Sequence, residues 1–148
     1  MTFTEFLQII AGGVGSLGFG YLFNIRGKYL AVATIGGLLS WFLFIVLHYL
    51  IPNEPICYFI VSFLMSVYAE VMARVMKTPT TTFITTTLVP LIPGGSLYKT
   101  MASAFESNAD LFLTRGIATL ELAAALALGI IVAASLTKLL LHKKTPAK

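Results

Sequence analysis

The stretch "TPTTTFITTTLVPLIPGG", Thr78 to Gly95, decides the fold of this chain. Threonine dominates its first half, and two prolines, Pro90 and Pro93, precede a pair of glycines at its end. Long apolar runs lie on both sides of it. The chain therefore places a hydroxyl-rich segment, which cannot form one continuous helix, between segments that can.

The composition is that of a membrane protein. Of 148 residues, 57% are hydrophobic and 11% are charged, whereas a soluble domain carries about 25% charged residues. An apolar run of about 20 residues spans the bilayer core of about 30 Å as a helix. We therefore predict an all-α integral membrane protein made of a single membrane domain, residues 1–148. Because Glu5 stands where a signal peptide would carry basic residues, we expect the first apolar segment to be retained as a span.

The sequence lacks the residue patterns of most enzymes. Cys57 is the single cysteine, which rules out an intrachain disulfide, and the two histidines, His48 and His142, lie far apart. No HExxH, P-loop, GxSxG or CxxC pattern is present. We therefore expect a protein that is not an enzyme and needs no cofactor. We also expect no binding to nucleic acid, because the net charge of +4 is accounted for by loop residues that orient the spans.

Hydropathy predicts about five transmembrane segments, the fourth of them discontinuous. A basic tail at 142–148 follows the last one. The predicted segments cover approximately residues 3–25, 29–51, 55–76, 79–107 and 111–141.

The charges of the connecting loops predict the orientation. Arg26 and Lys28 follow the first segment, Glu54 is the charge of the second loop, and Arg74 and Lys77 close the third segment. Lysine and arginine concentrate on the cytoplasmic side, so the N-terminus is expected outside and the basic C-terminus in the cytoplasm. A re-entrant fourth segment would put the basic tail outside, so the charges favour a crossing.

The fourth segment is a candidate transport path. Pro90 and Pro93 remove two backbone donors, so the helix should break between Pro90 and Gly95. Discontinuous helices build binding sites in many transporters. The alternatives are that the threonines bond to their own helix or join helices, and that the proline-glycine element only ends a span. The candidate path residues here are Thr81, Thr82 and Thr85 on one helical face, then Pro90, Pro93, Gly94, Gly95 and Lys99.

Two carboxylates lie within apolar segments. Glu70 is one helical turn from Arg74 and can pair with it, and Glu121 flanks a face of small residues that includes Gly129. Ionisable residues at membrane depth usually face a bundle interior or a cavity, so both are candidates for proton coupling. The alternatives are an ion pair near the cytoplasmic interface for Glu70 and a packing carboxylate for Glu121.

Three sequence elements resemble the threonine/serine exporter (ThrE) family. They are "GSLGFGYLFNIRGKYL" (15–30), "RVMKTPTTTF" (74–83) and "LVPLIPGGSLY" (88–98). The likeness covers nearly the whole chain and points to the small membrane half that occurs as a separate subunit. The family motif falls here on Pro90, Pro93, Gly94, Gly95 and Tyr98.

The resemblance implies a subunit of a secondary exporter in the bacterial inner membrane. Its substrates would be threonine and serine or succinate-like dicarboxylates, and its partner a larger subunit with a cytoplasmic domain. A five-span half that begins outside would pair with a half of opposite topology as an inverted repeat, which permits alternating access. Two other functions remain open: a structural subunit that only assembles a complex, and a channel-like homo-oligomer with the threonines lining a shared pore.

Overall fold

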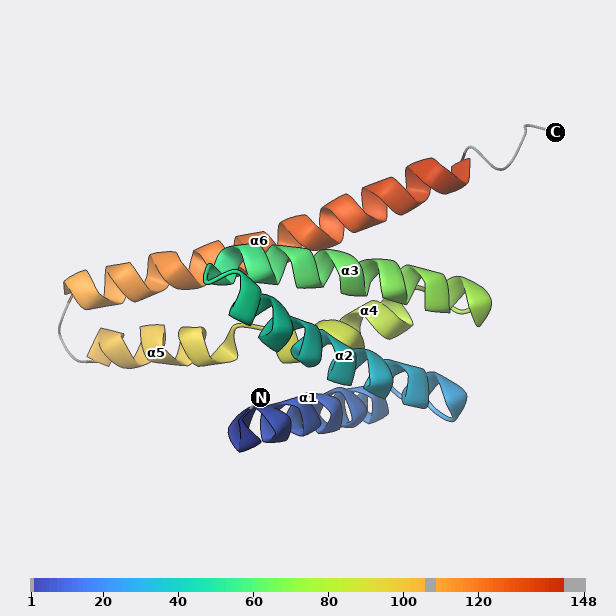
Figure 1. Cartoon of the computed structure of the whole chain (residues 1–148), viewed down its shortest axis with the longest axis horizontal. Coiled ribbons are helices and arrows are strands. Elements are labelled where there is room, and N and C mark those ends of the chain that lie inside the picture. The colour runs from blue at the N-terminus through green and yellow to red at the C-terminus, as the bar shows by residue number, and fades with distance from the viewer. Residues whose placement is uncertain (1, 106–108, 143–148) are drawn as a thin grey trace.

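The computed structural model of the chain describes residues 2–105 and 109–142, and within these ranges the regular secondary structure consists of helices joined by short turns (Figure 1). This confirms the prediction of an all-α protein. The elements are α1 (Phe3–Leu22), α2 (Lys28–Leu50), α3 (Glu54–Val75), α4 (Thr81–Leu88), the 3₁₀ helix η1 (Val89–Leu91), α5 (Gly94–Phe105) and α6 (Ala109–His142).

The helices follow the predicted segments to within a few residues: α1 ends at Leu22, three residues before the predicted end, and α4 begins at Thr81, two residues after the predicted start at Pro79. Three helices are long and apolar enough to cross a membrane, namely α2, α3 and the part Ala109–Leu139 of α6. The helix α1 and the broken unit of α4, η1 and α5 are not among them, so the count of five crossings stays a prediction. Residues 106–107 of the fourth segment and 143–148 of the basic tail lie outside the described residues.

Short turns reverse the chain between the first helices. The side chain of Asn53 accepts a hydrogen bond from the backbone N–H of Ile56 at 3.3 Å and caps α3, as asparagine does at many helix starts. Gly27 before α2 and Lys77 after α3 both have positive φ angles, 62° and 53°. Successive long helices therefore run in opposite directions, while α4, η1 and α5 follow one another in the same direction (Figure 1).

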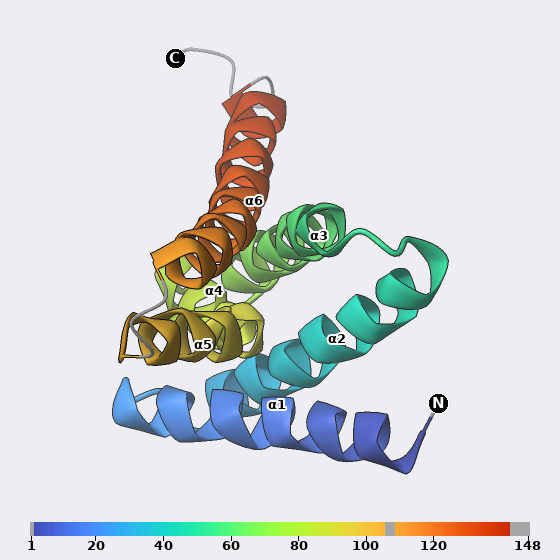
Figure 2. The ribbon, with the colours of Figure 1, turned by 90° about the vertical axis from the view of Figure 1, so that its left-hand side faces the viewer.

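The helix α4 lies in the interior of the bundle. It contacts α1, α2 and α3, whereas α5 packs against α6 and α6 packs along α3 (Figure 2). Phe83 of α4 is fully buried against Ala33, Ala69 and Ala73. A second apolar cluster joins η1 to α3 and α6, and its buried members are Tyr58, Val61, Met65, Leu88, Leu91 and Leu122.

Glycines let the helices approach one another closely. A Cβ atom added at Gly37 of α2 would lie 1.9 Å from the Ser16 hydroxyl of α1. One added at Gly129 of α6 would lie 1.9 Å from the Ser62 hydroxyl and 2.6 Å from the backbone oxygen of Phe59. Small residues at such contacts are the usual means by which membrane helices pack.

The contact of Gly129 with Ser62 also sets the register of α6 on α3, which run in the same direction (Figure 1). Glu121 precedes Gly129 by as many residues as Glu54 precedes Ser62, so Glu121 lies level with the first residue of α3. The helix α6 is about 50 Å long against about 33 Å for α3. The part of α6 before Glu121 therefore extends beyond α3, together with α5.

The outer surface is apolar, as expected of a protein surrounded by lipid or by other subunits. Many large apolar side chains are exposed, including Leu22, Leu50, Val75, Leu120 and Leu139.

Gly129→Ala should separate α3 from α6, because the new methyl group meets backbone atoms of α3 that cannot move away independently. We expect a loss of about 1–3 kcal/mol, as for overpacking in general, visible as a lower Tm of the detergent-solubilised protein. Gly18→Ala is the matched control, since Gly18 is exposed and has no neighbour within 4 Å of an added Cβ. Equal Tm values for the two variants would contradict the packing described here.

Candidate functional site

The fourth segment breaks where the prolines predict. The helix α4 ends at Leu88, and η1 continues with a tighter turn that closes with a hydrogen bond from the backbone N–H of Ile92 to the oxygen of Val89 at 3.2 Å. The helix α5 then begins at Gly94, and the N–H of Leu97 donates to the oxygen of Pro93 at 3.0 Å. The interior of the bundle thus contains the end of one short helix, and the next helix begins beside it.

The predicted threonine face does not line the interior as a set. Thr81 and Thr85 are exposed and Thr82 is half-buried. The Thr85 hydroxyl donates to the backbone oxygen of Thr81 at 2.7 Å, and the buried Thr86 hydroxyl donates within α4 in the same way. Hydrogen bonds from threonine hydroxyls to the backbone of their own helix were the alternative to a role of these threonines in a transport path.

Thr87 was not among the path residues predicted from the sequence. Its side chain is fully buried and its hydroxyl has no hydrogen-bond partner. A buried hydroxyl without a partner costs about 1–3 kcal/mol, so such groups are uncommon in native structures. Thr87 faces α2 at Gly36, where an added Cβ would lie 2.5 Å from its hydroxyl.

Three more buried polar groups without partners lie on the helices around α4. They are the Ser16 hydroxyl of α1, the indole N–H of Trp41 on α2 and the Ser66 hydroxyl of α3. Ser16 and Thr87 lie against the adjacent residues Gly37 and Gly36 of α2, one helical turn before Trp41. Three helices therefore bring donors without partners to one region beside the break.

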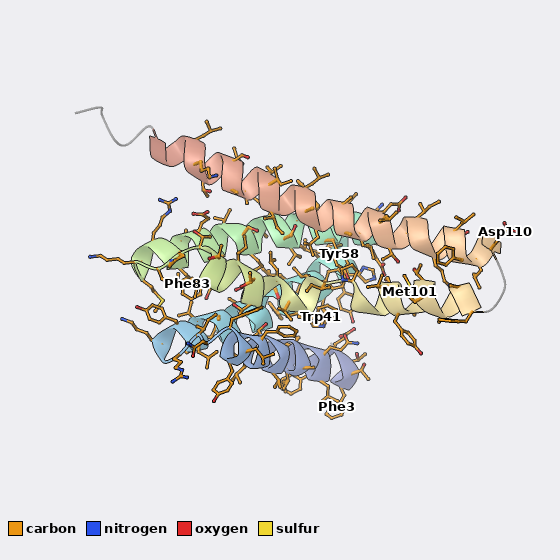
Figure 3. The ribbon with its side chains drawn as sticks, turned by 180° about the vertical axis from the view of Figure 1, so that it is seen from behind. Phe3, Trp41, Tyr58, Phe83, Met101 and Asp110 are labelled. Carbon is orange, nitrogen blue, oxygen red and sulfur yellow. The ribbon has the colours of Figure 1, made fainter. Side chains whose placement is uncertain are left out.

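A small pocket opens at this region. It has a volume of about 270 Å³ and is lined by Gln8, Ala11, Gly12, Trp41 and Pro90. Figure 3 shows Trp41 beside the junction of α4 and α5. The pocket combines the amide of Gln8 with apolar walls, and its size suits a small metabolite. Pro90 is the predicted site residue that it contains.

A second, apolar groove of about 380 Å³ runs along the outer side of α4, between α1 and α6. Thr85 is the single hydroxyl residue in its lining, which otherwise consists of Phe19, Phe23, Ile84, Leu88, Val89, Ile92, Leu126 and Ile130.

The remaining motif residues lie at the start of α5. Pro93 is half-buried, Gly94 and Gly95 are exposed, and nothing lies within 4 Å of a Cβ added to either glycine. Tyr98 and Lys99 are exposed on α5. This end of the site is open, in contrast to the sealed region around Thr87.

Glu70 and Arg74 form the ion pair expected from their spacing. Their side chains meet at 3.2 Å on successive turns near the end of α3, with 15% of the Glu70 side chain and 48% of the Arg74 side chain exposed. Glu121 lies elsewhere: its side chain is exposed, level with the opposite end of α3. The structure therefore does not bring the two candidate coupling carboxylates together.

Polar side chains also join α5 to α6, a feature that the sequence analysis missed. The hydroxyls of Thr100 and Thr119 lie 2.9 Å apart, and Arg115 donates to the hydroxyl of Ser103. Thr100, Ser103 and Thr119 are buried. The residues lie on two helices whose pairing is not encoded in any local pattern, so spacing could not reveal them.

No curated protein and no solved structure matches the chain. Residues 8–136 match the family described as Threonine/Serine exporter, ThrE. The match includes every helix from α2 to α5 and most of α1 and α6, so the chain belongs to the threonine/serine exporter family.

Proposed function

We propose that this chain is the membrane subunit of a secondary exporter for small polar metabolites, either threonine and serine or succinate-like dicarboxylates. The observation that carries the proposal is the group of buried donors without partners, Ser16, Trp41 and Thr87, beside the break in the fourth segment. A substrate with hydroxyl, amino or carboxylate groups would supply the missing partners when it binds.

The proposed site extends from the pocket of Gln8, Gly12 and Trp41 to the hydroxyl of Thr87. In this structure Thr87 and Ser16 are sealed from solvent, while the pocket at Pro90 is open. Movement of α4 against α2 would expose the two hydroxyls to a substrate. The break at η1 permits such movement because no continuous backbone ladder joins α4 to α5.

We further propose that five segments cross the inner membrane of a bacterium, with the N-terminus outside. Successive segments run in alternating directions, which supports this topology (Figure 1). A larger subunit of opposite topology would complete an inverted repeat, and the two halves would alternate access to the site. The exposed apolar side chains provide surface for such a partner.

Glu70 is the better of the two candidates for ion coupling. Its side chain is mostly buried and its partner Arg74 lies near the end of α3, where a proton can reach it from water. Protonation of Glu70 would release Arg74, since the ion pair requires the charged carboxylate. Arg74 would then be free to meet a substrate carboxylate on the cytoplasmic side.

A second candidate function is a channel-like homo-oligomer. The exposure of Thr81 and Thr85 on the outer side of α4 favours it, since those hydroxyls could line a pore shared between copies. A channel passes its solute down the gradient without exchange, whereas a carrier exchanges labelled for unlabelled substrate.

Efflux from preloaded vesicles should distinguish these functions. We expect labelled threonine, serine or succinate to leave vesicles that contain this chain together with its candidate larger subunit, and we expect external unlabelled substrate to accelerate the efflux. Efflux from this chain alone, without acceleration, would support the channel. Full efflux from the larger subunit alone would leave this chain a structural role.

Thr87→Val should separate stability from transport. The variant removes a hydroxyl that has no partner, so the free energy of unfolding should stay equal or rise. Transport should fall about tenfold if the hydroxyl bonds to substrate, as expected for one lost hydrogen bond. The measurements are the Tm in detergent and the efflux rate in vesicles.

Thr100→Val is the matched control for that variant. It breaks the buried contact with Thr119, so its free energy of unfolding should fall by about 1 kcal/mol. A destabilised Thr87→Val variant, or one that transports at the rate of the wild type, would show that Thr87 is a packing residue.

A further inference from the structure

The hairpin of α5 and α6 has its polar side chains inside and its apolar side chains outside. Thr100, Ser103 and Thr119 are at most 8% exposed and lie between the helices. The exposed apolar side chains on the outer face of α5 are Leu97, Tyr98, Met101 and Phe105. The polar interior of this hairpin includes one half-buried cation, Arg115 of α6.

Arg115 uses a single nitrogen for its contacts with α5. Its Nη1 atom donates to the backbone oxygen of Lys99 at 3.3 Å and to the hydroxyl of Ser103 at 3.4 Å. Both distances are long for hydrogen bonds of this kind. The Nε and Nη2 atoms have no hydrogen-bond partner among the described residues, and these two atoms form the edge with which arginine binds a carboxylate through two parallel bonds.

Among residues 2–105 and 109–142, no carboxylate forms an ion pair with Arg115. The pair of Glu70 and Arg74, on another helix, is the ion pair that the described part of the chain contains. The guanidinium is always charged at neutral pH, and a half-buried cation without a counter-ion attracts an anion. Lys99, exposed on the adjacent helix, adds a second positive charge to the same hairpin.

We propose that Arg115 binds a carboxylate of the transported metabolite at the end of the molecule where α5 and α6 are joined. The inference rests on the proposed function and adds a residue to it. Ser103 is a positioning residue: its hydroxyl donates to the backbone oxygen of Lys99 at 2.7 Å and accepts the bond from Nη1 of Arg115, which holds that nitrogen against α5.

The position of the site defines its role. Arg115 precedes Glu121 and therefore belongs to the part of α6 that extends beyond the start of α3. Glu54 and Glu121 are exposed and lie level with each other, nearer the middle of the bundle than Arg115. Because charged side chains favour the membrane surface, the proposed site lies near that surface and is reachable from water. In the proposed orientation it faces the outside, where it is the last site that a carboxylate meets before release.

Binding to the full-length chain in lipid nanodiscs tests the proposal. The probes are labelled succinate and L-threonine, each with its unlabelled carboxamide as competitor. We expect Arg115→Gln to raise the Kd for both probes at least about tenfold, the effect of losing a charged bidentate contact. Arg115→Lys should raise it nearly as much, because lysine keeps the charge but lacks the planar edge. The carboxamides should compete poorly with wild type.

Lys138→Gln is the matched control. It removes the same charge from an exposed position near the other end of α6, and its Kd should equal that of the wild type. Circular dichroism and the Tm of each variant report whether it folds. If Arg115→Gln does not fold, Arg115→Lys still tests the proposal. An unchanged Kd in Arg115→Lys, equal competition by carboxamides, or an equal loss in Lys138→Gln would overturn the proposal.

Efflux separates this inference from the proposed function. Wild-type efflux together with a Kd that does not depend on Arg115 overturns the carboxylate site alone. Binding that depends on Arg115 without efflux under any combination of subunits supports the site and overturns the exporter function.

Discussion

The missing backbone donors of Pro90 and Pro93 are the constraint on which the rest of the structure depends. In apolar surroundings each backbone group needs a partner within the protein or water in a cavity, and two prolines three residues apart cannot both lie inside one helix. The α-helix therefore gives way to the 3₁₀ helix η1, which closes one hydrogen bond, and a new α-helix begins at Gly94. This exchange of one long helix for two short ones brings helix ends and polar side chains into the bundle.

The neighbouring helices accommodate the broken segment through small residues. Gly36 of α2 makes room for the side chain of Thr87, and Gly37 makes room for Ser16. Because the helices approach so closely, the hydroxyls are sealed without being paired. A buried polar group without a partner carries a free-energy cost that a polar ligand would remove by binding to it. The proposed transport function uses this cost, and the chain belongs to the threonine/serine exporter family.

Short-range sequence patterns predicted much of the fold and part of the candidate site. The helix ends, the break at Pro90 and the pair of Glu70 and Arg74 follow from nearby residues. The inward face of α4 could not be predicted in this way. Helical periodicity groups Thr81 with Thr85, whereas the contact with Gly36 of α2 shows that Thr87 faces the interior. The depth of Glu121 and the contacts of Arg115 depend on how α6 lies on α3 and α5, which no local spacing encodes.

Cysteine labelling on both sides of the broken segment tests the central claim most directly. Cys57 is buried, so Cys57→Ser provides the background for Lys77→Cys, before α4, and Asp110→Cys, after α5, both at exposed positions. A crossing predicts that a membrane-impermeant maleimide labels the two thiols from opposite sides, Lys77→Cys from the cytoplasm and Asp110→Cys from outside. Labelling of both from the same side would mean that the segment is re-entrant, and it would contradict the account.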